Sequence, residues 1–383
     1  MKQTEEQIWA EQVLNRITKK MNQMRERAAE KIPYTAKNGV YDDNSADAVE
    51  KSYGIGWWTN GFWGGMMWLL YHETREERYA EIARYSEKQL DLCFEQFYDL
   101  SHDVGFVYQP TAIADYRLTG SPDGRRRGLH AANLLAGRFN PAGNFIRAWN
   151  DWGDDRDTTG WAIIDCMMNL NLLYWASEEL QDPRFRQIAM LHADTAMSAF
   201  VRPDGSVCHI VSFDPETGER LGSLGGQGYQ EGSSWTRGQA WGLYGFILSY
   251  LHTGKQEYLD TAKRIAHYFI SNIPENGRIP VDFRAPAEPF YEDATAAAIA
   301  ACGLLEIASH VSVLESGLYR NAAVHLLKTL DEKDCDYRPE TDGILQNCTA
   351  AYHDREHQFH IVYGDYFYLE AILKLKGTEF LMW

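Results

Sequence analysis

The sequence predicts an all-α protein in which six helical hairpins close into an (α/α)6 barrel. Helical segments of two kinds alternate along the 383 residues. Some are apolar nearly all round, which is typical of buried helices, and others alternate apolar with charged residues, which is typical of helices that face solvent on one side. The order of outer helix, loop and inner helix recurs loosely six times, with no low-complexity linker between the units. We therefore expect residues 1–383 to form a single domain.

The amphipathic helices are predicted to form the outer layer. The first occupies residues 1–20, "MKQTEEQIWAEQVLNRITKK", which contain no apolar signal core. The other five are expected over residues 74–90, 121–136, 182–200, 254–269 and 316–330.

The apolar helices are predicted to form the inner layer. They are expected over residues 64–74, 111–120, 161–180, 237–254, 294–311 and 363–377. A loop rich in aromatic or β-branched residues precedes them, as in "HDVGFVYQ" and "GSVCHIVSF". In such a barrel these loops open at one end, so a functional site is expected there.

Composition limits the partners of the chain. The net charge of -17 argues against nucleic acid, whose binding needs clustered Lys and Arg. No apolar run is long enough to span a membrane.

The six cysteines show no CxxC or metal-ligand spacing, so a reduced, cytoplasmic setting is expected, with Cys166 and Cys302 as small core residues. The 12 Trp, 22 Tyr and 16 Phe fit either a large core or a cleft lined with rings.

Asp165 is a candidate for chemistry because it interrupts the apolar run "WAIIDCMMNLNLLYWA". An ionised carboxylate is rarely buried unless it is paired, since its desolvation is costly. One interpretation is structural, with a neighbouring backbone group or an arginine satisfying the carboxylate. The other is functional, with burial raising its pKa so that a proton stays available for general acid catalysis. Asp103, beside His102 in another loop at the same end, could complete an acid–base pair or simply cap a turn.

The segment "GQGYQEGSSWTRGQAWGLYGF" indicates a site for an acidic sugar. Arg237 and Trp241 are four residues apart and share one helix face. There a guanidinium can pair with a carboxylate while a ring packs on a pyranose. A core tryptophan beside an arginine that reaches solvent fits the same spacing. The small residues Gly238, Gly242 and Gly245 predict close contact with a neighbouring helix.

Further rings are expected around the mouth of the barrel. They are His209, Trp58, Trp63 and Trp149. Each of them alone fits core packing as well as ligand contact. His357 and His360 lack convergent Cys or Asp spacing, so no metal site is predicted.

Six motifs together resemble glycoside hydrolase family 88, the unsaturated glucuronyl hydrolases. In chain order they are "WWTNGFWGG", "SHDVGFVY", "IIDCMMNLNLLYWA", "EGSSWTRGQAWG", "ACGLLEIAS" and "YGDYFYLEAILKL". The resemblance implies a catalytic (α/α)6 barrel that needs no metal or organic cofactor. It also implies a substrate, the glycosaminoglycan oligosaccharide left by a polysaccharide lyase, from which the unsaturated uronic acid at the non-reducing end is released. The implied chemistry is hydration of the C4=C5 vinyl ether rather than ordinary glycosidic hydrolysis.

The resemblance implies roles for individual residues as well. Asp165 resembles the general acid/base of the family, and Asp103 resembles a second essential aspartate. The positions that match contacts to the unsaturated sugar are His102, Trp58, Trp149, His209, Gln227, Arg237 and Trp241. Two features depart from the family pattern. Asn60 replaces the acid of "WTDGFW", and the loop "NCTAAYHDREHQFHIV" lacks the serine-rich pattern that some members use toward the next sugar.

Other functions stay open on the sequence. The sister family of unsaturated rhamnogalacturonyl hydrolases acts on pectin fragments and shares the RGQ-W pattern, but it fits the first and last motifs less well. A non-catalytic sugar-binding barrel would not need Asp103 and Asp165, and a sugar 2-epimerase would be expected to carry paired histidines on inner helices. The run Arg125–Arg127 and Arg138 could meet an acidic chain, although such runs more often form a solvated face. The sequence predicts neither the oligomeric state nor the linkage or sulfation of the substrate.

Overall fold

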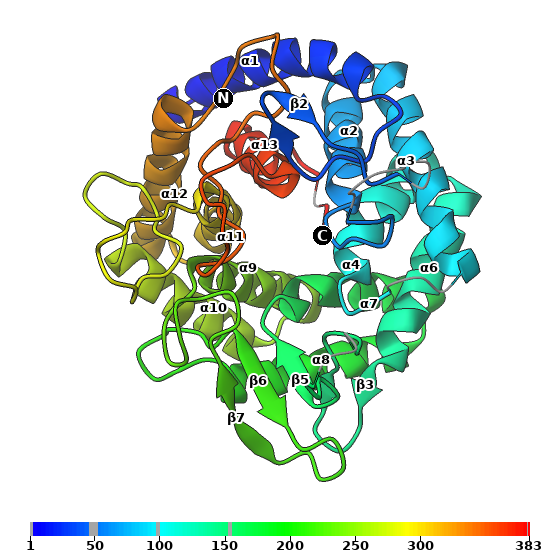
Figure 1. Cartoon of the computed structure of the whole chain (residues 1–383), viewed down its shortest axis with the longest axis vertical. Helices are drawn as coiled ribbons and strands as arrows, with labels where there is room; N and C mark the ends of the chain where they lie inside the picture. Colours follow the sequence, from blue (N-terminus) through cyan, green and yellow to red (C-terminus); the bar gives the residue numbers. More distant parts are fainter. Residues whose placement is uncertain (1–2, 46–52, 97–99, 152–154, 381) are drawn as a thin grey trace.

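Two concentric layers of helices surround a central axis (Figure 1) in the computed structural model, which describes residues 3–45, 53–96, 100–151, 155–380 and 382–383. The outer layer consists of α1 (Glu5–Arg27), α3 (Glu77–Gln96), α6 (Pro122–Gly137), α8 (Pro183–Ala199), α10 (Gln256–Ser271) and α12 (Val313–Lys333). The inner layer consists of α2 (Gly61–Thr74), the unbroken run α4 (Val104–Tyr108), η1 (Gln109–Ile113) and α5 (Ala114–Thr119), then α7 (Cys166–Leu180), α9 (Thr236–Thr253), α11 (Ala294–His310) and α13 (Val362–Lys376).

The inner helices pack side by side in a closed ring. α2 contacts η1 and α13, α4 contacts α7, α7 contacts α9, and α11 lies between α9 and α13. Each outer helix packs on an inner one, and α1 packs on α13, so that the first and last helices of the chain are neighbours (Figure 1). The predicted (α/α)6 barrel is confirmed.

Local sequence explains where several helices begin and end. Thr4 and Gln7 form a capping box at the start of α1. Ser121 and Asp182 each accept a backbone N–H at the start of α6 and α8, where proline occupies the first turn. Gly254 ends α9 in the left-handed conformation.

Burial follows the predicted division into two layers. Every residue of α11 from Ala294 to Leu305 is buried, as a helix that is apolar all round requires. Close packing inside the ring depends on small residues, since a Cβ at Gly245 of α9 would lie 2.4 Å from the Cβ of Met167 on α7. Cys166 and Cys302 are buried and unpaired, as the sequence predicts.

The prediction of a helix from residue 161 is wrong at its start. Residues Trp161–Ile163 form strand β5, and α7 begins only at Cys166. Aromatic and β-branched residues favour a strand where a partner is available. β5 finds that partner in β6 (Ile210–Phe213), which also pairs with β7 (Arg220–Leu224). Asp165 is therefore the N-cap residue of α7 and not a residue one turn inside the helix.

Other boundaries differ as well. The second inner helix begins at Val104 rather than at residue 111, and it passes Pro110 in the π-helical segment η1. A wider turn accommodates a proline, which has no N–H to donate. α1 extends beyond residue 20 to Arg27, while Met1 and Lys2 lie outside the described residues.

Two short hairpins lie in the connections between helices. β1 (Ala36–Lys37) pairs with β2 (Val40–Tyr41), and β3 (Phe139–Asn140) pairs with β4 (Phe145–Ile146). No helix within the described ranges is long and apolar enough to cross a membrane.

Candidate active site

A cavity of about 560 Å³ opens at the end of the barrel where the inner helices begin. Asp103 and Asp165 directly precede α4 and α7, while Arg237 and Tyr363 lie in the first turns of α9 and α13. Trp58, just before α2, also lines the cavity. Helix N-termini carry partial positive charge, so their convergence favours an anionic ligand in spite of the negative net charge of the chain.

Asp165 lies deep in this cavity, with its side chain only 14% exposed. Its Oδ1 atom is buried and has no hydrogen-bond partner among the described residues. Burial and the nearby negative charge of Asp103 raise the pKa of Asp165 to about 7. Its carboxyl group is therefore partly protonated near neutral pH, which is the condition for both giving and taking a proton.

Asp103 lies at the start of the neighbouring helix α4 and is held by its neighbours in the preceding loop. The Nε2 atom of His102 lies 3.3 Å from Asp103 Oδ1, and the hydroxyl of Ser101 donates to Oδ2 over 3.3 Å. The backbone N–H of His102 donates to the carbonyl oxygen of Ala148 over 3.2 Å, which fixes the loop. His102 and Asp103 both line the cavity, as the sequence predicts.

His209 lies beside Asp165 and is buried behind the described residues that line the cavity. Its Nε2 atom is 3.9 Å from Asp165 Oδ1, and the ring packs against Trp235 with centroids 4.3 Å apart. Burial, together with the positive charge of Arg237, lowers the pKa of His209 to about 3. The imidazole is therefore neutral at physiological pH.

Gln227 and Arg237 both reach the loop that precedes α13. The side chain of Gln227 donates to Ala350 O over 2.9 Å. Arg237 is buried, and its Nη1 atom donates to Asp293 over 2.6 Å and to Thr349 O over 2.7 Å. The charge of Arg237 is thus balanced by Asp293 while its guanidinium still lines the cavity.

The tryptophans divide between cavity and core. Trp58 and Trp149 line the cavity. Trp241 lies behind it, packed on Phe106 and Phe367 with ring centroids 4.9 and 5.2 Å away. Trp63, which the sequence places at the mouth, is also fully buried and outside the described cavity lining. The structure therefore supports the core interpretation for both Trp241 and Trp63.

Sequence reasoning missed several lining residues. They are Tyr34, Tyr53, Trp57, Asn150, Asp354 and Tyr363. Tyr34 and Tyr53 come from the segment between α1 and α2, outside the motif "WWTNGFWGG" that begins at Trp57. Tyr363 offered a signal, because it belongs to the motif "YGDYF" at the start of an inner helix.

Asn60, which departs from the expected motif, organises the loop beneath Trp57 and Trp58. Its side-chain amide donates to Gly54 O over 3.0 Å and to Ile55 O over 2.7 Å. Its Oδ1 atom accepts from the side chain of Asn44 over 3.0 Å. An aspartate could not donate these two hydrogen bonds.

The arginines of the basic run pair with the protein itself. Arg125, Arg126 and Arg127 form ion pairs with Glu179, Asp123 and Asp91. Arg138 donates to the carbonyl oxygens of Leu100, Arg147 and Ala148, and so supports the loop that carries His102. None of the four is among the described residues that line the cavity.

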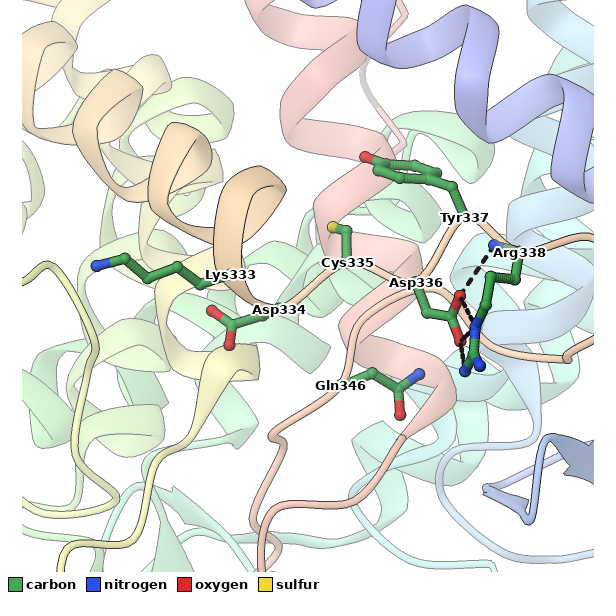
Figure 2. Close-up of a pocket in the computed structure, with 7 residues that line it drawn as sticks. All are labelled: Lys333, Asp334, Cys335, Asp336, Tyr337, Arg338 and Gln346. Carbon is green, nitrogen blue, oxygen red and sulfur yellow. Dashed lines mark hydrogen bonds and ion pairs between the residues drawn. The ribbon is translucent and has the colours of Figure 1, made fainter.

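A second hollow, of about 550 Å³, lies at the C-terminal end of α12 (Figure 2). Figure 2 shows Asp336 and Arg338, which both line it, paired with each other. Arg338 Nη2 lies 2.6 Å from Asp336 Oδ2. Burial raises the pKa of the Cys335 thiol, so this group is not an activated nucleophile. The hollow shares no described lining residue with the cavity of Asp165.

Two of the relatives of the chain are described as hydrolases of unsaturated sugars. The chain is 39% identical over 327 residues to an unsaturated glucuronyl hydrolase of Bacillus sp. strain GL1, covering 83% of this chain and 86% of that protein. It is 33% identical over 324 residues to an unsaturated chondroitin disaccharide hydrolase of Streptococcus pyogenes serotype M1, covering 83% and 80%. No model of a protein family matches the chain.

Solved structures agree with these relatives. The unsaturated glucuronyl hydrolase of Bacillus sp. GL1, described as responsible for the degradation of glycosaminoglycan, matches with a TM-score of 0.86 and 35% identity over 94% of this chain and 96% of that one. The unsaturated glucuronyl hydrolase of Streptococcus agalactiae matches with a TM-score of 0.90 and 29% identity, covering 98% and 94%. An aspartate-to-asparagine variant of the latter, complexed with dGlcA-GalNAc6S, matches with a TM-score of 0.83 and 28% identity, covering 98% and 94%.

Proposed function

The chain belongs to the unsaturated glucuronyl hydrolases of glycoside hydrolase family 88, and from this premise we propose its substrate and mechanism. The substrate is a glycosaminoglycan oligosaccharide made by a polysaccharide lyase, which carries a 4,5-unsaturated uronic acid at its non-reducing end. The enzyme releases that sugar. Support comes from the relatives that act on chondroitin disaccharides and from the relative described as degrading glycosaminoglycan.

The reaction is hydration of the vinyl ether. A carboxylic acid gives its proton to C4, and water adds at C5 while its own proton returns to the carboxylate. The resulting C5 hemiketal opens to a ketone and leaves a hemiacetal at C1. That hemiacetal collapses to an aldehyde and frees the neighbouring sugar, so one water is consumed in all.

We assign the proton transfers to Asp165. The observation that carries this assignment is a buried carboxyl group with an unpartnered Oδ1 and a pKa raised to about 7 in the cavity. A proton donor to carbon must be protonated near neutral pH, and its conjugate base must then be able to take a proton from water. Asp103 assists by holding a like charge nearby, which favours the protonated form of Asp165.

The remaining site residues bind the unsaturated sugar in this proposal. Trp58 and Trp149 offer rings for the pyranose, and Arg237 with the converging helix N-termini favours the carboxylate. His102, His209 and Gln227 supply hydrogen bonds, and Trp241 supports the wall from behind. No step requires a metal or an organic cofactor.

We also propose that the whole chain acts as one catalytic domain in the cytoplasm. The closed ring that joins α1 to α13 supports the single domain. The six cysteines, all within the described residues, form no disulfide, which is typical of proteins in a reducing compartment.

The test uses unsaturated disaccharides prepared with lyases from chondroitin, hyaluronan, heparin and rhamnogalacturonan. Turnover is followed by loss of the ultraviolet absorbance of the conjugated double bond. We expect loss with glycosaminoglycan disaccharides and none with the pectin fragment. Loss with the pectin fragment alone would move the substrate to that of the sister family.

A further inference from the structure

The two ring nitrogens of His209 have different surroundings. Nδ1 accepts a hydrogen bond from the backbone N–H of Gln227 over 3.0 Å. A backbone N–H can only donate, so a proton on Nδ1 would face another proton. In a neutral imidazole the remaining proton then belongs to Nε2.

The loop before Gln227 is fitted to this ring. Gly226 has φ +57, and a Cβ there would lie 1.9 Å from Nδ1 of His209. The close approach of the backbone to the ring thus requires glycine at this position, by both conformation and space. The loop is tied from its other side, where Tyr352 N donates to Gln227 O over 2.9 Å and Gln227 Nε2 donates to Ala350 O over 2.9 Å.

The backbone of His209 is tied to the segment that carries Asp165. The N–H of Ile164 donates to the carbonyl oxygen of His209 over 3.1 Å. Nε2 of His209 lies 3.9 Å from Asp165 Oδ1, beyond direct hydrogen-bond distance. Both atoms are buried and have no hydrogen-bond partner among the described residues.

The charged and titratable groups around the ring are Asp165, Arg237 and His102, and the pKa of His209 is lowered mainly by burial and by Arg237. Trp235 covers one face at a centroid distance of 4.3 Å. A second proton on this imidazole would add positive charge next to a buried arginine. The backbone of Gly225 acts in the opposite direction on the pKa, but burial and the charge of Arg237 outweigh it and keep the ring neutral.

We infer that the backbone at Gly226 and Gln227 holds His209 in the neutral tautomer that carries its proton on Nε2, which places a fixed N–H donor beside Asp165. With Nδ1 occupied, His209 cannot take the proton of Asp165, so that proton stays available for carbon. Gly226 and Gln227 are positioning residues that act through His209. The expectation that this N–H contributes to turnover rests on the proposed function. The inference about the tautomer does not.

The tautomer is measured on the free wild-type protein labelled with ¹⁵N-histidine. Two-bond ¹H–¹⁵N spectra distinguish a protonated from an unprotonated ring nitrogen, and the signals of His209 are those that disappear in His209→Gln. We expect an unprotonated Nδ1 and a protonated Nε2 that stay unchanged from pH 5 to pH 8. A protonated Nδ1, or titration of the ring in that range, would overturn the inference whether or not any substrate is turned over.

A matched pair of glycine variants tests the positioning role. Gly226→Ala should shift the His209 signals and lower kcat about a hundredfold, because a small misplacement of a site group has an effect of that order. Gly232→Ala is the control, since Gly232 lies in the same loop with φ +75 but a Cβ there would meet nothing within 4 Å. Equal kcat values in the two variants would contradict the role of Gly226.

Two substitutions of His209 test the donor. The amide nitrogen of glutamine can reach the place of Nε2, whereas asparagine reaches only the place of Nδ1. We therefore expect His209→Gln to keep at least tenfold more kcat than His209→Asn. Equal loss in both, with unchanged folding, would show that the N–H of His209 contributes nothing to turnover.

Discussion

At the scale of single residues, the environment of Asp165 decides the chemistry. Apolar burial and the charge of Asp103 act in the same direction on its pKa, while His102 and Arg237 act in the opposite direction. The balance leaves a carboxyl group that titrates near neutral pH, as a general acid/base needs. The sequence indicated that this aspartate was unusual, but it could not supply the balance, because the other groups come from the loop before α4 and from the first turn of α9.

A substitution at Asp103 tests how its charge affects the pKa of Asp165. Asp103→Asn should lower the pKa of Asp165 below its wild-type value of about 7, since the like charge that raises it is gone. The measurement is a pH titration of the Asp165 carboxyl carbon by ¹³C NMR, with Asp165→Asn used to identify its signal. An unchanged midpoint would show that Asp103 does not act on Asp165 through its charge.

The raised pKa of Asp165 also affects the stability of the fold. The pKa of Asp165 is raised from 3.8 to about 7 on folding, so the folded chain holds this proton more tightly than the unfolded chain. The associated stability is fully present below pH 3.8 and is lost as pH rises through about 7. Asp165→Asn should therefore gain stability relative to wild type between pH 5 and pH 8, by on the order of 2 kcal/mol. Urea unfolding at both pH values measures it, and a constant difference would contradict the raised pKa.

At the scale of elements, the helices were predictable and the loops between them were not. The inner helices could be recognised because they are apolar all round. The predicted boundaries of α9 and α11 agree with the observed ones to within about one residue. The start of α7 was missed because "WAII" fits an apolar helix as well as a strand. Only the position of β6, more than forty residues later in the chain, decides between them.

Asn60 shows how one side chain shapes a mouth loop. Asn60→Asp removes both donors to the carbonyl oxygens of Gly54 and Ile55. We expect a loss of about 1–3 kcal/mol in the free energy of unfolding, because buried acceptors lose their partners. KM should rise more than kcat falls, since the loop carries Trp57 and Trp58 rather than the proton-transfer group.

The matched control is Asn133→Asp on the outer helix α6, where the asparagine is exposed. It should leave both stability and KM nearly unchanged. If Asn60→Asp behaved like Asn133→Asp, the loop would not depend on the amide of Asn60.

At the scale of the whole molecule, ring closure brings together residues that are far apart in the sequence. Arg237 meets Asp293, and Gln227 meets Ala350, only because α9, α11 and α13 stand side by side. Periodicity predicts that such a ring forms, but it does not predict which loops touch across its mouth. For this reason Asp293, Ala350 and Tyr34 could not be read from the sequence as parts of the site.

The ring also depends on close contact between its inner helices. Gly245→Ala should cost about 1–3 kcal/mol, since its Cβ would overlap that of Met167 and part of the backbone of α7. Gly137→Ala is the control, because Gly137 ends an outer helix and a Cβ there meets nothing within 4 Å. Chemical denaturation compares the two variants. Equal stability would mean that α7 and α9 can separate without loss.

The most direct test of the account compares wild type with Asp165→Asn on an unsaturated chondroitin disaccharide and on its saturated counterpart. We predict that wild type removes the double-bond absorbance of the first and leaves the second intact. Asp165→Asn should remain folded and lose turnover by about 10²–10⁴-fold, the range that general acid–base catalysis supplies. Cleavage of the saturated disaccharide, or normal turnover in Asp165→Asn, would contradict hydration by this carboxyl group.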